Sequence, residues 1–115
     1  MNAMKNKVQE IWKPIQGYEG YYEVSNQGKV RSCYREITLS GKRNGQKRVY
    51  QSRELKPLNS QGHLVVQLHM DGVRMNIWLG RLVALHFVDG FRESGRVHVR
   101  YKDGDPKNCS IENLE

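Results

Sequence analysis

Apolar and polar residues alternate along three stretches of the chain, and residues that favour turns interrupt each stretch near its middle. The stretches are residues 21–34, 37–51 and 62–77, with turns expected at residues 25–28, Asn44-Gly45 and Asp71-Gly72. Asn-Gly pairs are typical of type I′ hairpin turns, because both central residues of that turn need positive φ. The third stretch places Leu64, Val66 and Leu68 on one face, as a half-buried strand does. The pattern therefore predicts three antiparallel β-hairpins.

A helical period follows the third hairpin. Its apolar stripe consists of Leu79, Leu82, Val83, His86 and Phe87, at the spacing of one helix face. This stripe predicts a short helix that packs against the core and ends at Asp89-Gly90. Because His86 lies on the stripe, we interpret it as a packed, hydrogen-bonded histidine rather than a metal ligand.

The C-terminal stretch combines a strand pattern with a turn and a helix start. Residues 97–102 alternate as a strand does, and Asp103-Gly104 is typical of a turn. Ser110 is a favoured N-cap residue, which predicts a helix beginning at Ile111. The expected order is three hairpins, a helix, and a ββα unit whose helix has barely begun, so the fold class is α+β.

The 115 residues suffice for one domain, or for two very small lobes that share a core. We expect a β-hairpin nucleic-acid-binding module at residues 11–56 and the ββα unit at residues 57–115. Cys33 and Cys109 form no CxxC pair, so a zinc site of the finger type is not expected. The chain has no apolar run near the ~20 residues of a membrane helix and no signal-type N-terminus, which favours a cytoplasmic protein without membrane contact.

The net charge of +7 is concentrated in one segment of the chain. Residues 29–56 contain nine basic residues against Glu36 and Glu54, whereas basic and acidic residues balance elsewhere. Such a concentrated basic segment favours a polyanionic partner, nucleic acid above all. The candidate phosphate contacts here are Lys29, Arg31, Arg35, Lys42, Arg43, Lys47, Arg48 and Arg53. A basic tip on the second hairpin also suits the major groove of DNA, which admits a two-stranded ribbon.

Two sets of residues resemble a known family. Trp12, Ile15, Gly17-Tyr18-Glu19, Tyr22, Val24-Ser25-Asn26, Gly28, Val30 and Arg31-Ser32 resemble the nuclease-associated modular (NUMOD-type) domain. That module lies at the N-terminus of many HNH homing endonucleases of phages and introns. Arg81-Leu82-Val83-Ala84, Phe87, Asp103-Gly104, Asn108 and Asn113-Leu114-Glu115 resemble the HNH domain, a His-Me finger, that follows it. The resemblance covers nearly the whole chain, from about residue 11 to residue 115.

The resemblance implies that the N-terminal β-ribbon region grips DNA and that a ββα-metal site cuts it. In the family, a carboxylate and a histidine before the Asp-Gly turn bind the metal and deprotonate water. Here these positions hold Arg100, which is permanently protonated, and Tyr101, a poor base with an ordinary pKa of about 10. Gly80 replaces the histidine that usually precedes Arg-Leu-Val-Ala, and the helix ligand is expected beyond Glu115.

The leading hypothesis is a catalytically inactive HNH-endonuclease-like protein that binds duplex DNA and needs no metal or other cofactor. Arg100, in the position of the metal's carboxylate, is a further candidate phosphate contact. One alternative is a phage-type inhibitor or adaptor that binds a host nucleic-acid-processing protein, such as a CRISPR effector or a polymerase. The other is a residual DNA nickase that uses magnesium or manganese, with His98 as its base. The sequence indicates neither a DNA target nor an oligomeric state.

Overall fold

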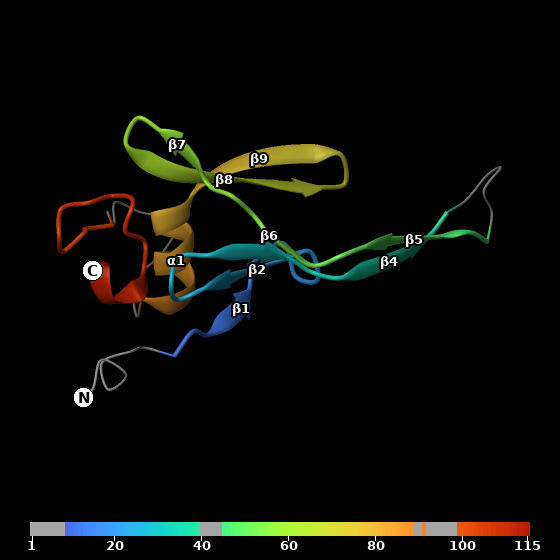
Figure 1. Ribbon diagram of the computed structural model, residues 1–115, viewed down its shortest axis with the longest axis horizontal. Coiled ribbons are helices and arrows are strands. Elements are labelled where there is room, and N and C mark those ends of the chain that lie inside the picture. Colours follow the sequence, from blue (N-terminus) through green and yellow to red (C-terminus); the bar gives the residue numbers. More distant parts are fainter. Residues whose placement is uncertain (1–8, 40–44, 89–90, 92–98) are drawn as a thin grey trace.

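The computed structural model describes residues 9–39, 45–88, 91 and 99–115. The strands are β1 (Trp12–Pro14), β2 (Tyr22–Ser25), β3 (Val30–Ser32), β4 (Arg35–Thr38), β5 (Lys47–Tyr50), β6 (Arg53–Glu54), β7 (Leu58–Ser60), β8 (His63–Met70) and β9 (Val73–Trp78). Within the described residues there is one α-helix, α1 (Leu79–Phe87), and a 3-10 turn, η3 (Ile111–Asn113). The order of elements is shown in Figure 1. Antiparallel strands with one short helix confirm the predicted α+β class.

The strands form three antiparallel sheets, in the orders β1-β2-β3-β6, β4-β5 and β7-β8-β9. The β2–β3 and β8–β9 hairpins confirm two of the predicted hairpins. Asp71 and Gly72 both have positive φ, +53° and +79°, as a type I′ turn requires. The β7–β8 hairpin was not predicted, although Gln61 and Gly62 adopt the same conformation at +53° and +87°. Glutamine is not among the residues that favour such turns, so the sequence pattern missed this strand.

The second predicted hairpin is present as β4 and β5, but its turn differs from the prediction. Thr38 pairs with Lys47, and the Leu39 N–H donates to the Gln46 carbonyl at 2.7 Å. A two-residue turn at Asn44-Gly45 would pair Gln46 with the residue before Asn44, so that prediction is wrong. The cross-strand register outweighs the local turn preference, because it decides the partner of every side chain on the ribbon.

A continuous core joins the two ends of the chain. Ile15, Val24 and Val30 of the N-terminal part pack with Val66 and Leu68 of β8 and with the buried stripe of α1. Each fully buried side chain of this kind contributes roughly 1.5–3 kcal/mol by removal of apolar surface from water. The helix packs against β2, β8, β9 and η3, which places it between the sheets and the C-terminal segment (Figure 1). The core therefore spans the expected boundary near residue 56, and the division into two domains stays a prediction.

His86 ties α1 to the loop after β1. Its Nδ1 lies 2.8 Å from the Leu82 carbonyl, and its Nε2 accepts from the Gln16 N–H at 2.9 Å. These contacts require the proton on Nδ1. The interpretation of His86 as a packed, hydrogen-bonded histidine is confirmed. The helix ends at Phe87, and the predicted stop at Asp89-Gly90 lies outside the described residues.

The C-terminal segment differs from the predicted strand and helix. Residues 97 and 98 lie outside the described residues, and residues 99–102 form a single β-bridge, between Tyr101 and Leu114. The predicted turn is confirmed, since the Gly104 N–H donates to the Tyr101 carbonyl at 2.8 Å. From Ile111, however, the chain makes one 3-10 turn instead of an α-helix. Leu114 is buried and pairs back with Tyr101, and this pairing is incompatible with a continuing helix.

The predicted cap is also absent from this turn. Ser110 occupies the N-cap position, but its side chain makes no capping hydrogen bond. Its Oγ donates instead to Glu112 Oε1 at 2.8 Å. In the part of the chain that the structure describes, a complete ββα unit is therefore not present. No helix among these residues has the length and apolar character to cross a membrane.

Candidate nucleic-acid interface

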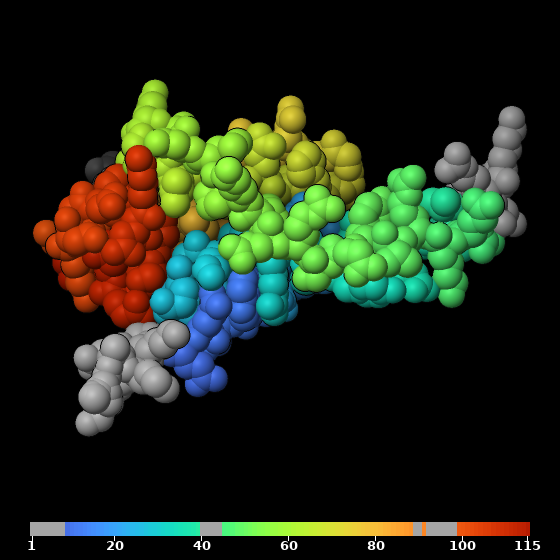
Figure 2. All heavy atoms as spheres, viewed as in Figure 1, coloured from blue at the N-terminus to red at the C-terminus, as the bar shows by residue number. Residues whose placement is uncertain are grey.

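The β4–β5 ribbon has two faces that differ in charge. Because Arg35 pairs with Tyr50 and Ile37 with Arg48, these four side chains share one face. The opposite face carries Glu36, whose Oε1 lies 3.2 Å from Lys47 Nζ. Among the described ribbon residues, the first face therefore combines two arginines with no acidic side chain. We call it the basic face of the ribbon. Figure 2 shows the ribbon as a narrow arm that projects from the body of the molecule.

Aromatic rings hold the arginines of the basic face in place. The Arg35 guanidinium lies 4.2 Å from the Tyr21 ring centre and 4.9 Å from that of Tyr50. Arg48 Nη1 donates to Tyr50 Oη at 3.4 Å. Such cation–π contacts are each worth about 0.5–1 kcal/mol at exposed sites. These contacts hold the Arg35 guanidinium beside the Tyr21 and Tyr50 rings and Arg48 beside the Tyr50 hydroxyl.

The remaining candidate phosphate contacts are spread over the molecule. Arg31 is held by Glu23, with 2.8 Å between Nη2 and Oε1, and lies 4.0 Å from the Trp12 ring centre. Lys29 is exposed in the β2–β3 connection, and Arg53 is exposed in β6. Lys42 and Arg43 lie outside the described residues. The structure therefore places Arg35 and Arg48 on one face of the ribbon and engages Arg31 and Lys47 with carboxylates.

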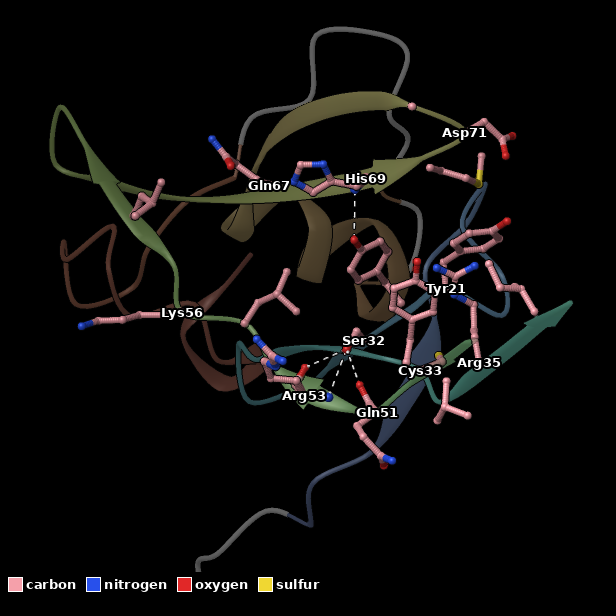
Figure 3. Close-up of a pocket in the computed structure, with 18 residues that line it drawn as sticks. Tyr21, Ser32, Cys33, Arg35, Gln51, Arg53, Lys56, Gln67, His69 and Asp71 are labelled. Carbon is pink, nitrogen blue, oxygen red and sulfur yellow. Dashed lines mark hydrogen bonds between the residues drawn. The ribbon is translucent and has the colours of Figure 1, made fainter. Parts of the chain in front are cut away.

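A groove of about 1030 Å³ runs between the ribbon and the β8–β9 hairpin. Figure 3 shows Tyr21 and Arg35 on one wall, with Gln67 and His69 on the other. Arg53 and Lys56 line it as well. Tyr22 also lines the groove, and its hydroxyl accepts a hydrogen bond from the His69 backbone N–H at 3.0 Å. We call this feature the ribbon groove.

The sequence analysis missed several residues of the ribbon groove. Tyr21, Tyr50, Gln67 and His69 were not among the candidates, because none of them carries a charge that stands out along the sequence. Their proximity follows from the strand register and from the packing of two separate sheets. In the sequence, the tyrosines that flank the basic segment could have indicated some of these groove residues.

Tyr101 and Gly80, which stand where the family has a histidine, pack against each other. Tyr101 lies against Gly80 at the start of α1, and a Cβ on Gly80 would overlap Tyr101 Oη and lie 3.0 Å from Cζ. Burial, and after it the nearby Cys109, raises the pKa of Tyr101 above its usual value. Two of the positions at which the sequence departs from the family thus meet in space. The Tyr101 phenol fills the space that any side chain at position 80 would need.

Asp103 is fully engaged in holding its own turn. Its oxygens accept from the Asn108 and Asn113 side-chain amides, both at 2.9 Å, and from the Asp105 N–H at 2.8 Å. The Asn108 bond, then those of Asp105 and Asn113, lower the pKa of this carboxyl. Asp103 is therefore a structural carboxylate that stays ionised at neutral pH.

The residues around this turn do not fit the metal that the resemblance implies. Arg100 is an exposed cation whose backbone pairs with Glu115, and Tyr101 is packed against α1. A search of the described residues finds no group of three or more histidine, cysteine, aspartate or glutamate side chains that could hold a metal ion. His98, the proposed replacement base, lies outside the described residues.

Both cysteines are free thiols. Burial raises the pKa of Cys109 to about 11, and burial is also the main cause of the raised pKa of Cys33. Because the thiolate is the reactive and metal-binding form, neither residue is primed for such chemistry at neutral pH.

A family model described as the NUMOD4 motif matches residues 10–69, which is more than half of the chain. The chain belongs to the NUMOD4 family. This NUMOD4 protein is 33% identical over 103 residues to the DNA endonuclease I-HmuI of Bacillus phage SP01. The match covers 90% of the chain and 49% of that relative.

A solved structure agrees with the sequence comparison. The structure, described as "DNA binding and cleavage by the HNH homing endonuclease I-HmuI", superposes with a TM-score of 0.68 at 33% identity. It matches 90% of the NUMOD4 chain and 50% of its own chain. The resemblance to HNH homing endonucleases is thus confirmed as homology. The chain spans about half the length of the relative it matches.

Proposed function

We propose that this chain binds duplex DNA through the basic face of the ribbon and does not cleave it. The observation that carries the proposal is the charge asymmetry of the ribbon. Arg35 and Arg48 share a face without a carboxylate, whereas Lys47 on the other face is paired with Glu36. A β-ribbon fits the major groove, and ordered arginines suit phosphate oxygens and guanine edges. Homology to a DNA-binding endonuclease supports the same partner.

The packing of Tyr101 supports the absence of cleavage. A general base must reach a water beside the scissile phosphate, whereas the Tyr101 hydroxyl is packed beside Gly80 and its pKa is raised. Arg100 next to it provides a permanent positive charge where the family places the metal's carboxylate. An exposed guanidinium can bind a backbone phosphate there, but it supplies neither a metal ligand nor a base. The turn would thus retain DNA contact without hydrolysis.

The binding half of this proposal is tested by the salt dependence of duplex affinity. Fluorescence anisotropy with a labelled duplex should show log K falling linearly with log salt concentration. Four basic side chains on the ribbon and groove side, those of Arg35, Arg48, Arg53 and Lys56, imply a slope of roughly −4. Affinity that does not depend on salt would contradict phosphate binding.

A matched pair of variants tests the assignment to one face. Arg48→Gln should reduce the steepness of the salt slope by about 1, because it removes one phosphate contact. Lys47→Gln, the neighbouring control on the opposite face, should change it less, because Lys47 is already paired with Glu36. Equal effects of the two variants would exclude the basic face as the principal DNA-binding surface.

A further inference from the structure

We propose that the ribbon groove binds unpaired nucleotides of a single nucleic-acid strand. This ligand differs from the duplex that we assign to the basic face, although the groove shares Arg35 and Tyr50 with that face. The inference rests on the proposed function only in that both require a nucleic-acid partner.

The first argument is the preformed stacking platform. The Arg35 guanidinium contacts the rings of both Tyr21 and Tyr50, at 4.2 and 4.9 Å from their centres. Tyr50 is 38% exposed, so part of its surface remains open. Bases stack on tyrosine and arginine planes regardless of sequence, and each such contact is worth about ten-fold in affinity. In a duplex the base faces are covered by their neighbours, whereas an unpaired strand exposes them.

The second argument is the arrangement of charge and hydrogen-bonding groups. Arg53 and Lys56 line the groove beside the stacking platform, and Asp71 is the one acidic residue among the lining residues. The opposite wall carries the Gln67 and His69 side chains (Figure 3). Cations suit the phosphates of a strand, and an amide and an imidazole suit the edges of unpaired bases.

The size of the ribbon groove also favours a single strand. The groove volume of about 1030 Å³ lies slightly above the roughly 300–1,000 Å³ range of small-ligand pockets. This space suits a few nucleotides. An acidic protein segment would match the charge of the groove, but it would leave the planar groups of Tyr21, Arg35 and Tyr50 unused. The combination of planar and cationic groups therefore favours a nucleic-acid strand.

The decisive experiment compares labelled strands that differ only in their bases. Anisotropy titrations of the whole chain would use a short single strand, an abasic strand of equal length and charge, and the corresponding duplex. We expect the strand with bases to bind about ten-fold more tightly than the abasic strand. Tyr50→Leu, on the exposed ribbon, should abolish this preference, and Tyr21→Leu should do so independently. Tyr34→Leu is the matched control, because Tyr34 is 55% exposed and does not line the groove.

Each outcome bears on one of the two proposals. Equal affinity for the base-containing and abasic strands would overturn the strand site. So would displacement of the strand by polyglutamate of matched charge as effectively as by unlabelled strand, which would indicate an acidic protein ligand. Duplex binding without a base-dependent preference would overturn only the present inference. Strand binding without duplex binding would overturn only the proposed function, and no binding to any nucleic acid would overturn both.

Discussion

Gly80 and Tyr101 pack against each other, although they lie far apart in the sequence. In the sequence they are two separate departures from a nuclease pattern, 21 positions apart. In the structure the Tyr101 phenol fills the space beside Gly80, so a larger residue at either position constrains the other. A side chain at position 80 therefore requires Tyr101 to move.

This packing contact predicts that Gly80→Ala changes the free energy of unfolding in the direction opposite to the usual one. Gly→Ala inside a helix usually stabilises a protein by up to about 1 kcal/mol. Gly80→Ala should instead lower the free energy of unfolding by about 1–2 kcal/mol, because its Cβ would overlap Tyr101 Oη. In a Tyr101→Ala background the same change should be neutral or stabilising. Urea denaturation of the four proteins measures this coupling, and strictly additive effects would contradict the packing relation.

Charge along the sequence identified the basic segment but could not rank its residues as candidate contacts. Arg31 and Arg48 look equivalent in the sequence, yet Arg31 contacts Glu23 and Trp12 while Arg48 contacts Tyr50. These partners depend on which residues face one another across strands. A shift of one position in either register would reverse the faces, so only the structure separates the paired cations from the others.

At the scale of elements, turns with strong local preferences were predictable and weaker ones were not. Asp71-Gly72 turns as its residue types indicate, and the helical stripe from Leu79 gives α1. The turn at Gln61-Gly62 has the same geometry without the favoured residue type. The 3-10 turn at Ile111 arises from a tertiary contact, the pairing of Leu114 with Tyr101, which no local pattern of residues 110–114 encodes.

The turn that holds this C-terminal element should respond to acid. The pKa of Asp103 is lowered most by the Asn108 side chain, so the carboxyl prefers to be ionised in the folded state. Its stabilising contribution is therefore fully present above the unfolded-state pKa of about 3.9 and is lost as the pH falls through the lower folded-state pKa. Asn108→Ala should raise the pKa of Asp103 toward its usual value.

An NMR titration of the side-chain carboxyl carbons measures this shift directly. Asn76→Ala, a change in β9 at a residue that does not bond to Asp103, is the matched control and should leave the pKa of Asp103 unchanged. An Asp103 pKa at or above the usual value in the unmodified chain would show that the hydrogen-bond network does not stabilise the ionised form.

At the scale of the whole molecule, one core positions the surfaces to which we assign nucleic-acid ligands. Val24 and Val30 of the N-terminal sheet pack with Leu68 and with α1, which fixes the β8–β9 hairpin relative to the β1–β6 sheet. The ribbon that extends from that sheet presents its basic face, and the ribbon groove lies where ribbon and hairpin meet. The turn at Asp103-Gly104 lies beyond α1, where Tyr101 packs against Gly80. This layout is the one that our proposal of DNA binding without cleavage requires.

The central claim, DNA binding without cleavage, is tested most directly by one gel-shift titration with magnesium present. A labelled duplex is saturated with the protein, and the same samples are run on native and denaturing gels. We predict a retarded complex on the native gel and two intact strands on the denaturing gel. A nicked strand whose appearance is abolished by His98→Ala, or a duplex that is not retarded, would contradict the claim.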